Sequence, residues 1–323
     1  MKPLLDVRNL SVVFRTRAGN VHAVEDVSYT LAPGESLAIV GESGSGKSVS
    51  ALSLLGLVPP PGVIENGELL FNDRDVLKMT DTELQQLRGQ EIAMIFQDPM
   101  TSLNPVLTIE NQLTESLISH EAVSKPEAMR RAVETLTLVG IPNAEQRLLD
   151  YPHQFSGGQR QRIMIAMAII CKPSLLVADE PTTALDVTIQ AQIVDLVKEL
   201  QENLGMAVIW ITHDLALVAG IVDRVAVMYA GSLVEHGPVD QIFDAPRHPY
   251  TVGLLQSMPN FDSTVQRRLK SIKGAPPDLK QEMRGCPFAP RCSLVFEQCS
   301  VQRPALDPAG AGASVACWQA GVQ

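Results

Sequence analysis

The sequence of 323 residues contains no apolar run long enough to cross a membrane. The run from Ile163 to Cys171 is far shorter than the roughly 20 residues that a membrane-spanning helix needs. The N-terminus, Met1 to Asp6, also lacks the apolar core and the small-residue cleavage site of a signal peptide. We therefore expect the protein to stay in the cytoplasm and to associate with a membrane only through a partner.

Basic residues are scarce, with 26 Lys and Arg against 36 Asp and Glu and a formal net charge of −10. Non-specific nucleic-acid binding needs clustered cations, so this balance argues against a nucleic-acid partner, although local basic patches could still exist. The apolar fraction of 45% and the charged fraction of 19% are those of an ordinary globular protein. The length fits one large α/β domain with an appendage, or two modest domains.

Cysteine is rare too, and four of the five cysteines, Cys286, Cys292, Cys299 and Cys317, lie in the last forty residues. Disulfides are uncommon in a reducing cytosol, so this cluster points to metal or redox chemistry. The spacings of five, six and seventeen intervening residues do not match the C-x₂-C pattern of zinc sites. Four thiolates suit an iron–sulfur cluster or structural zinc, and unmetallated cysteines stay a third option. Cys171, on an apolar helix, is expected to be an inert buried thiol.

One stretch does indicate a ligand, because it fits the phosphate-binding pattern G-x-x-x-x-G-K-[ST]. It follows the apolar run Ser36 to Val40 and precedes an apolar helical segment, Val49 to Leu57. Lys47 is expected to reach the β/γ-phosphates of a nucleotide, and the Ser48 hydroxyl to bind Mg²⁺. The residues of the motif are Gly41, Glu42, Ser43, Gly44, Ser45, Gly46, Lys47 and Ser48.

Acidic and imidazole side chains follow two further buried-strand patterns. The apolar run Leu175 to Ala178 ends in Asp179 and Glu180, the position at which a nucleotide's Mg²⁺ is held and a general base can act. His213 follows the run Ala207 to Ile211, where a contact with the γ-phosphate is plausible. A lone histidine at a strand end is more often structural.

Two other features are weaker when taken alone. Ser156, Gly157, Gly158 and Gln159 open an apolar helix, and such a start presents free N–H groups to an anion, although most Ser-Gly-Gly segments are only helix caps. Phe14 lies in a strand pattern and is a candidate platform for adenine, although core packing is the commoner role.

The order of these patterns gives the domain organisation. Strand patterns from Leu4 to Leu31 predict an antiparallel sheet, and amphipathic helices at Thr108 to His120 and Lys125 to Val139 predict an inserted helical subdomain. We predict a nucleotide-binding domain over residues 1–240, with the helical subdomain at about 100–155. Residues 241–323 form a C-terminal extension that carries the four cysteines.

Together, the phosphate loop, Gln97, the Ser-Gly-Gly-Gln segment, the Asp-Glu pair and His213 resemble the ATP-binding cassette family over about residues 4 to 240. The resemblance implies an α/β fold with a P-loop NTPase (RecA-like) core, an N-terminal antiparallel β subdomain and an inserted helical subdomain. It also implies that two cassettes pack head to tail and enclose two ATP molecules with Mg²⁺. Each ATP would lie between the phosphate loop of one chain and the Ser-Gly-Gly-Gln segment of the other.

The resemblance also implies roles for individual residues. Ser48, Gln97 and Asp179 would serve Mg²⁺, with Gln97 also contacting the attacking water, and Glu180 would be the general base. His213 would contact the γ-phosphate.

On the partner-facing side, Ser156 and Gly158 would contact the ATP of the second chain. Asp186 would lie at the interface between the two cassettes and couple the two sites.

The segments Gln97 to Pro105 and Pro246 to Thr251 are similar to those of oligopeptide and dipeptide importer ATPases. This similarity implies a peripheral subunit at the cytoplasmic face of the inner membrane, with two permease subunits, a second ATPase chain that need not be identical, and an external substrate-binding protein. Some similar importer ATPases hold a [4Fe–4S] cluster. An importer of nickel or another small solute, and a soluble cassette ATPase acting on nucleic acid or the ribosome, are the alternatives.

Overall fold

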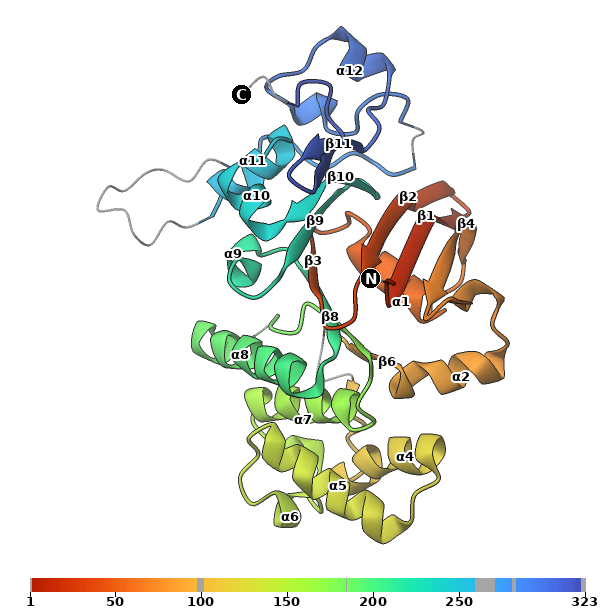
Figure 1. Ribbon diagram of the computed structural model, residues 1–323, viewed down its shortest axis with the longest axis vertical. Coiled ribbons are helices and arrows are strands. Elements are labelled where there is room, and N and C mark those ends of the chain that lie inside the picture. The colour runs from red at the N-terminus through yellow and green to blue at the C-terminus, as the bar shows by residue number, and fades with distance from the viewer. Residues whose placement is uncertain (1, 98–101, 184, 259–270, 281–282, 321–323) are drawn as a thin grey trace, which may run out of the picture. The chain divides into compact units, whose positions relative to one another are not determined.

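The computed structural model describes residues 2–97, 102–183, 185–258, 271–280 and 283–320 (Figure 1). Residues 98–101, which belong to the segment Gln97 to Pro105 that is similar to importer ATPases, lie outside the described residues. So does Ala184, two residues before Asp186. The chain forms two compact units. The first comprises Met1–Leu31, Ser36–Leu77 and Ile211–Gln323, and the second comprises Ala32–Glu35 and Lys78–Trp210.

An antiparallel sheet opens the first unit, with strand order β2-β1-β4-β5. Its strands are β1 (Leu5–Thr16), β2 (Gly19–Leu31), β4 (Gly62–Phe71) and β5 (Arg74–Asp75). Alternate residues of β2 are buried and exposed between Val27 and Leu31, the pattern of a sheet with one face in water. The apolar stretch of β4 is short, Leu69–Phe71, and the strand is longer because it pairs with β1 as far as Gly62 opposite Phe14.

The first unit also contributes strands in the order β11-β12-β10-β9-β3. β3 runs parallel to β9. The other adjacent strand pairs in this order, β9–β10, β10–β12 and β12–β11, are antiparallel. The strands are β3 (Ser36–Val40), β9 (Arg224–Tyr229), β10 (Ser232–Pro238), β11 (Asp307–Gly310) and β12 (Ala313–Val315). The C-terminal extension thus adds β11 and β12 beside β10, as the blue segment of Figure 1 shows.

Short helices complete the first unit. They are α1 (Lys47–Leu54), α9 (Leu215–Val218), α10 (Val239–Asp244), α11 (Pro249–Gln256), η3 (Ala289–Arg291) and α12 (Glu297–Val301). The chain passes from the first unit to the second at η1 (Val76–Lys78). All five residues of β3 are buried, which agrees with the apolar run that precedes the phosphate loop in the sequence.

The second unit contains three of the described strands and the longest of the described helices. Its strands are β6 (Ile92–Ile95), β7 (Leu175–Asp179) and most of β8 (Ala207–Thr212), whose last two residues belong to the first unit. β6 runs parallel to β7. Its helices are α2 (Asp81–Gln90), α4 (Ile109–Glu121), α5 (Lys125–Leu138), α6 (Ala144–Arg147), η2 (Pro152–Gln154), α7 (Gly157–Ile169) and α8 (Val187–Leu204).

Helices α4 and α5 agree with the predicted helical segments to within a residue or two, because local signals determine their ends. The Thr108 side chain accepts a hydrogen bond from the Asn111 N–H and caps α4, whose C-cap Ala122 has a left-handed backbone conformation. Both helices pack against α7. Within the described residues, no helix combines the length and apolarity that crossing a bilayer requires.

Candidate functional site

The phosphate-binding motif in the first unit forms a loop that ends at α1. Gly46, the N-cap of α1, has φ 99°, and a Cβ there would lie 2.1 Å from the backbone oxygen of Ala23, so only glycine fits. The side chain of Lys47 is buried, and its Nζ donates to the backbone oxygens of Gly41 at 2.8 Å and Glu42 at 3.0 Å. The loop therefore has the compact, lysine-centred form that a phosphate cradle requires.

Other segments of the first unit support this loop. The Gly231 N–H donates to the Ser45 backbone oxygen at 3.0 Å, and the Glu42 N–H donates to the Tyr250 hydroxyl at 2.8 Å. The Ser45 hydroxyl is buried and has no hydrogen-bond partner among the described residues. Buried hydroxyls are nearly always paired, so this atom fits a loop that receives a polar ligand.

In the second unit, the structure brings together Gln97 and Glu180, which are 83 positions apart in the sequence. Gln97 Nε2 and Thr183 Oγ1 each donate to Glu180 Oε2 at 2.9 Å. Glu180 has φ 45°, which is uncommon outside glycine and costs backbone energy. Asp179 precedes it at the buried end of β7. A carboxylate held in this way has a fixed direction, which is the property a general base needs.

Thr183 is a residue of this site that the sequence analysis missed. Thr183 lies three residues after Glu180 in the chain. Its N–H donates to the Glu180 backbone oxygen at 3.1 Å and closes a tight turn. The spacing of three residues is the signal that could have indicated it, because a turn of that length returns the threonine to the carboxylate.

The Ser-Gly-Gly-Gln segment opens α7 with a capping box. The Gln159 N–H donates to Ser156 Oγ at 3.3 Å, and the Ser156 N–H donates to Gln159 Oε1 at 3.1 Å. Asp186 caps α8 in a similar way, accepting from the Ile189 N–H at 3.0 Å. A Cβ at Gly158 would approach Ile189 Cγ2 to 3.1 Å, so glycine lets the starts of α7 and α8 approach closely.

His213 and Phe14 lie in the first unit. His213 is exposed directly after β8, and Phe14 is half-buried on β1 with its ring beside Gly62, where a Cβ would come within 2.9 Å of Phe14 Cε1. The first unit thus carries the phosphate loop, His213 and Phe14. The motif residues in the second unit are Gln97, Ser156, Gly157, Gly158, Gln159, Asp179, Glu180 and Asp186.

The four C-terminal cysteines, Cys286, Cys292, Cys299 and Cys317, line one cavity of the first unit together with apolar side chains such as Phe288. Burial raises the pKa of the Cys286, Cys292 and Cys317 thiols. Within the described residues, no group of three or more His, Cys, Asp or Glu side chains has an arrangement that could hold a metal ion. Among the described residues, the four thiols therefore share a cavity without being grouped as the ligands of a metal site.

His248 has a structural role, as expected of a turn residue before proline. It is the N-cap of α11, and its Nδ1 accepts a hydrogen bond from the Tyr250 N–H at 3.0 Å. Burial lowers the pKa of His248 to about 3. The imidazole is therefore neutral at physiological pH, as this acceptor role requires.

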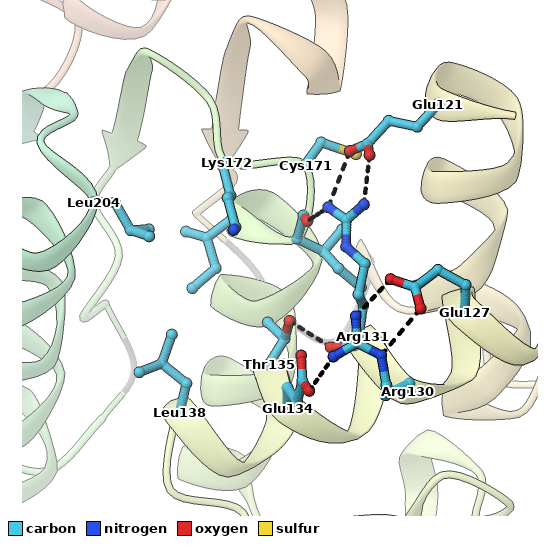
Figure 2. Close-up of a pocket in the computed structure, with 12 residues that line it drawn as sticks. Glu121, Glu127, Arg130, Arg131, Glu134, Thr135, Leu138, Cys171, Lys172 and Leu204 are labelled. Carbon is cyan, nitrogen blue, oxygen red and sulfur yellow. Dashed lines mark hydrogen bonds and ion pairs between the residues drawn. The ribbon is translucent and has the colours of Figure 1, made fainter. Parts of the chain in front are cut away.

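A cavity of about 690 Å³ lies within the second unit, and none of the predicted site residues lines it (Figure 2). Arg131 crosses it to form an ion pair with Glu121 and to donate to the Ile170 backbone oxygen at 2.9 Å, which ties α4 and α5 to the end of α7. Burial raises the pKa of the nearby Cys171 thiol to about 11, which agrees with an inert thiol. This cavity is a structural junction.

Comparisons with known proteins cover both parts of the chain. A family model described as "ABC transporter" matches residues 24–183, and one described as "Oligopeptide/dipeptide transporter, C-terminal region" matches residues 234–299.

Curated relatives are similar over nearly the full length. An oligopeptide transport ATP-binding protein, OppD, of Bacillus subtilis is 53% identical over 304 residues, which cover 94% of this chain and 85% of the relative. A dipeptide transport ATP-binding protein, DppD, of the same organism is 51% identical over 319 residues, covering 98% and 95%. The DppD of Lactococcus lactis is 55% identical over 289 residues, covering 89% and 82%.

Solved structures resemble the chain more partially. A dimeric ATP-binding cassette in a post-hydrolysis state, bound to ADP and Pi, matches with a TM-score of 0.64 at 29% identity over 73% of this chain and 98% of that one. A Clostridium perfringens protein that is part of an ABC transporter complex matches with a TM-score of 0.65 at 26% identity, covering 76% and 92%.

Proposed function

Because the chain belongs to the ABC transporter family of ATP-binding proteins, we propose that it hydrolyses ATP to power the import of di- and oligopeptides through a separate permease. The observation that carries this proposal is that the cassette region and the C-terminal region are both similar to peptide transport ATP-binding proteins. The 51% identity to a dipeptide transport ATP-binding protein extends over 98% of this chain, including the C-terminal region, whereas the dimeric cassette in its post-hydrolysis state matches only 73% of this chain.

The phosphate loop fits the triphosphate of ATP. Its backbone and Lys47 would hold the phosphates, and the buried Ser45 hydroxyl, which has no hydrogen-bond partner in the described part of the chain, supports a polar ligand there. Ser48, Gln97 and Asp179 would serve Mg²⁺, which when bound neutralises phosphate charge. Phe14 is proposed as the surface for adenine, and His213 as the contact for the γ-phosphate.

Glu180 is proposed as the general base. Two hydrogen bonds, from Gln97 and Thr183, converge on one carboxylate oxygen, Oε2. They fix the direction of the carboxylate, so that it can take a proton from a water that attacks the γ-phosphate. Gln97 therefore has two proposed duties, as a support of Glu180 and as a contact for that water.

The second wall of the nucleotide site is proposed to come from another ATPase chain. Ser156, Gly157, Gly158 and Gln159 would face the ATP of that partner, with Asp186 at the interface. The solved cassette with a TM-score of 0.64 is a dimer, which supports this assembly. The partner need not be an identical chain.

Substitution of Glu180 by glutamine tests the catalytic assignment. The Glu180→Gln variant should bind ATP with an affinity within about twofold of wild type and lose at least about 100-fold in hydrolysis, the usual contribution of a general base. Glu202→Gln changes an exposed glutamate of α8 and serves as the matched control. A Glu180→Gln variant with ordinary turnover would contradict the assignment.

We further propose that Cys286, Cys292, Cys299 and Cys317 hold a [4Fe–4S] cluster, with zinc as the alternative. Support comes from the cavity that all four line and from the purely thiolate donor set. Among the described residues the thiols are not grouped as metal ligands, so they would have to move together to hold the cluster. When bound, the cluster would cross-link the extension, which is rich in proline and glycine. Anaerobic purification should give about four iron atoms per chain and a broad visible absorbance. Zinc without colour, or neither metal, would overturn the cluster.

Location and partners follow from the same proposal. The protein would associate peripherally with the cytoplasmic face of the inner membrane through two permease subunits, and an external binding protein would deliver the cargo. Co-purification from native membranes should recover the permease and the second ATPase chain, and uptake assays should show peptide cargo. Uptake of nickel or another small solute would change the cargo, and nucleic acid without a membrane partner would contradict import.

A further inference from the structure

A partly buried ion pair joins the C-terminal extension to the phosphate loop within the first unit. Arg291 Nη1 lies 2.5 Å from Glu42 Oε2, and Nη2 lies 3.0 Å from Glu42 Oε1. The two residues are 249 positions apart in the chain, and the Arg291 side chain is only 4% exposed. Paired, parallel contacts of this kind are the strongest form of a guanidinium–carboxylate interaction.

The guanidinium is held on its other sides as well. Arg291 Nε donates to the Lys273 backbone oxygen at 3.0 Å, and Nη1 also donates to the Tyr229 hydroxyl at 3.3 Å. The ring centroids of Tyr229 and Phe288 lie 5.8 and 6.0 Å from its central carbon. The hydrogen bonds to Glu42 and Tyr229 raise the pKa of Arg291 above its already high value, so its charge is permanent.

The main chain of Glu42 is fixed by the same aromatic cluster. Its N–H donates to the hydroxyl of Tyr250, whose ring centroid lies 4.6 Å from that of Tyr229. From the other side, Lys47 donates to the Glu42 backbone oxygen. The residue after the first glycine of the phosphate loop is therefore held through its side chain, its N–H and its carbonyl.

The charge of Glu42 gives this arrangement a functional meaning. A carboxylate in a loop that binds a triphosphate repels the ligand unless a cation compensates it. Arg291 supplies that compensation through a partly buried pair, whose guanidinium side is shielded from solvent while the Glu42 side chain keeps 28% of its surface exposed.

We propose that Arg291 is a positioning residue for ATP: it neutralises Glu42 and, with Tyr250, holds the first turn of the phosphate loop in its binding shape. This inference rests on the proposed function only in taking ATP as the ligand of the loop. Because Arg291 ends η3, between Cys286 and Cys292, the segment that carries these two cysteines contacts the phosphate loop through one side chain.

ATP affinity and turnover of matched variants test the proposal. Arg291→Met should raise the ATP Kd about tenfold, with kcat at saturating ATP within about twofold of wild type, because the lost contact involves a charged hydrogen-bonded pair. Arg291→Lys keeps the charge without the fork and should raise the Kd less. In Arg291→Met/Glu42→Gln, the uncompensated carboxylate is gone, and the Kd should return to within about threefold of wild type.

Two controls separate positioning from general loosening of the extension. Arg284→Met removes an exposed charge of the extension, and Arg303→Met removes an ion pair to Glu25 on β2. Neither should change the ATP Kd by more than about twofold, even if Arg303→Met lowers thermal stability.

An unchanged Kd in Arg291→Met, or a double variant that binds ATP no better than the single one, would overturn the proposal. If Arg291→Met does not fold, Arg291→Lys carries the test, and a wild-type Kd there would overturn the role of the paired contact. Failure of the wild-type chain to bind ATP would contradict the proposed function itself, which is a distinguishable outcome.

Discussion

Two helix N-termini, those of α1 and α7, carry the glycine-rich motifs of this chain, and they are built differently. α7 begins with a side-chain cap, since Ser156 and Gln159 satisfy each other's backbone N–H groups. α1 begins at Gly46 without a side-chain cap, and its loop is held by residues as distant as Gly231, Tyr250 and Arg291. The start of α7 is locally determined, whereas the start of α1 depends on tertiary contacts.

The difference fits the two proposed duties. A phosphate loop must leave N–H groups for its ligand and still hold a costly backbone conformation, so its support must come from outside. A segment that meets ATP only when a second chain arrives can be stable by itself beforehand. We therefore expect substitutions at the start of α1 to change ATP binding most, and substitutions at α7 to change mainly stability.

The largest expected effect is at the start of α1. Lys47→Ala removes the proposed phosphate contact and the two hydrogen bonds to Gly41 and Glu42, so the isolated chain should lose at least about 100-fold in ATP affinity. Calorimetric titration with ATP measures this. Lys280→Ala, an exposed lysine of the same unit, should bind normally. Retention of binding in Lys47→Ala would remove the assigned role of the loop.

Substitutions at the C-terminal end of α7 should change the free energy of unfolding and leave nucleotide binding unchanged. Arg131→Met breaks the ion pair with Glu121 and the bond to the Ile170 oxygen (Figure 2), at a cost of about 1–3 kcal/mol in the free energy of unfolding. Arg130→Met, which loses exposed pairs with Glu127 and Glu134, is the matched control and should leave the denaturation midpoint unchanged. Equal midpoints for the two variants would show that the junction does not stabilise the unit.

The start of α7 should show a smaller effect on stability. Ser156→Ala removes the cap and should lower the free energy of unfolding by about 1 kcal/mol, without changing ATP binding by the isolated chain. ATP hydrolysis in the assembled transporter should fall, because Ser156 is assigned to the partner's ATP. Ser124→Ala at α5, where the serine makes no side-chain cap hydrogen bond, should be neutral. Loss of ATP binding by the isolated Ser156→Ala chain would contradict the comparison.

The smallest expected effect is a pH dependence of the unit that contains α1. Burial lowers the pKa of His248 to about 3 and that of His236 to about 4, below the unfolded value of about 6.5. The folded state then binds fewer protons, so this stability is present above about pH 6.5 and is lost as the pH falls toward these values. Burial raises the pKa of Glu235, which acts in the opposite sense.

A variant isolates the histidine contribution. His248→Asn keeps a side-chain acceptor for the Tyr250 N–H and cannot titrate. The thermal midpoint of wild type should fall by a few degrees more than that of the variant between pH 7 and 5. Parallel pH profiles would show that His248 does not contribute.

Much of the fold could be predicted from the sequence because its signals are local. The buried strands β3, β7 and β8 appear as apolar runs, and Thr108, Ser156 and Gly46 mark helix starts at the predicted positions to within a few residues. The length of β4 could not be predicted, because pairing with β1 and not composition extends it to Gly62.

The candidate site divides in the same way. Gly41 to Ser48 and the pair Asp179-Glu180 are contiguous motifs, so the sequence alone indicates a nucleotide and a carboxylate beside it. The spacing of three residues from Glu180 is a local signal for Thr183, whereas nothing in the sequence indicates that Arg291 and Tyr250 hold the residue after the loop's first glycine. Local periodicity determines where strands and helices form. Only the tertiary structure decides which side chains, 83 or 249 positions apart, meet at hydrogen-bonding distance, because the packing of the strands brings distant segments together.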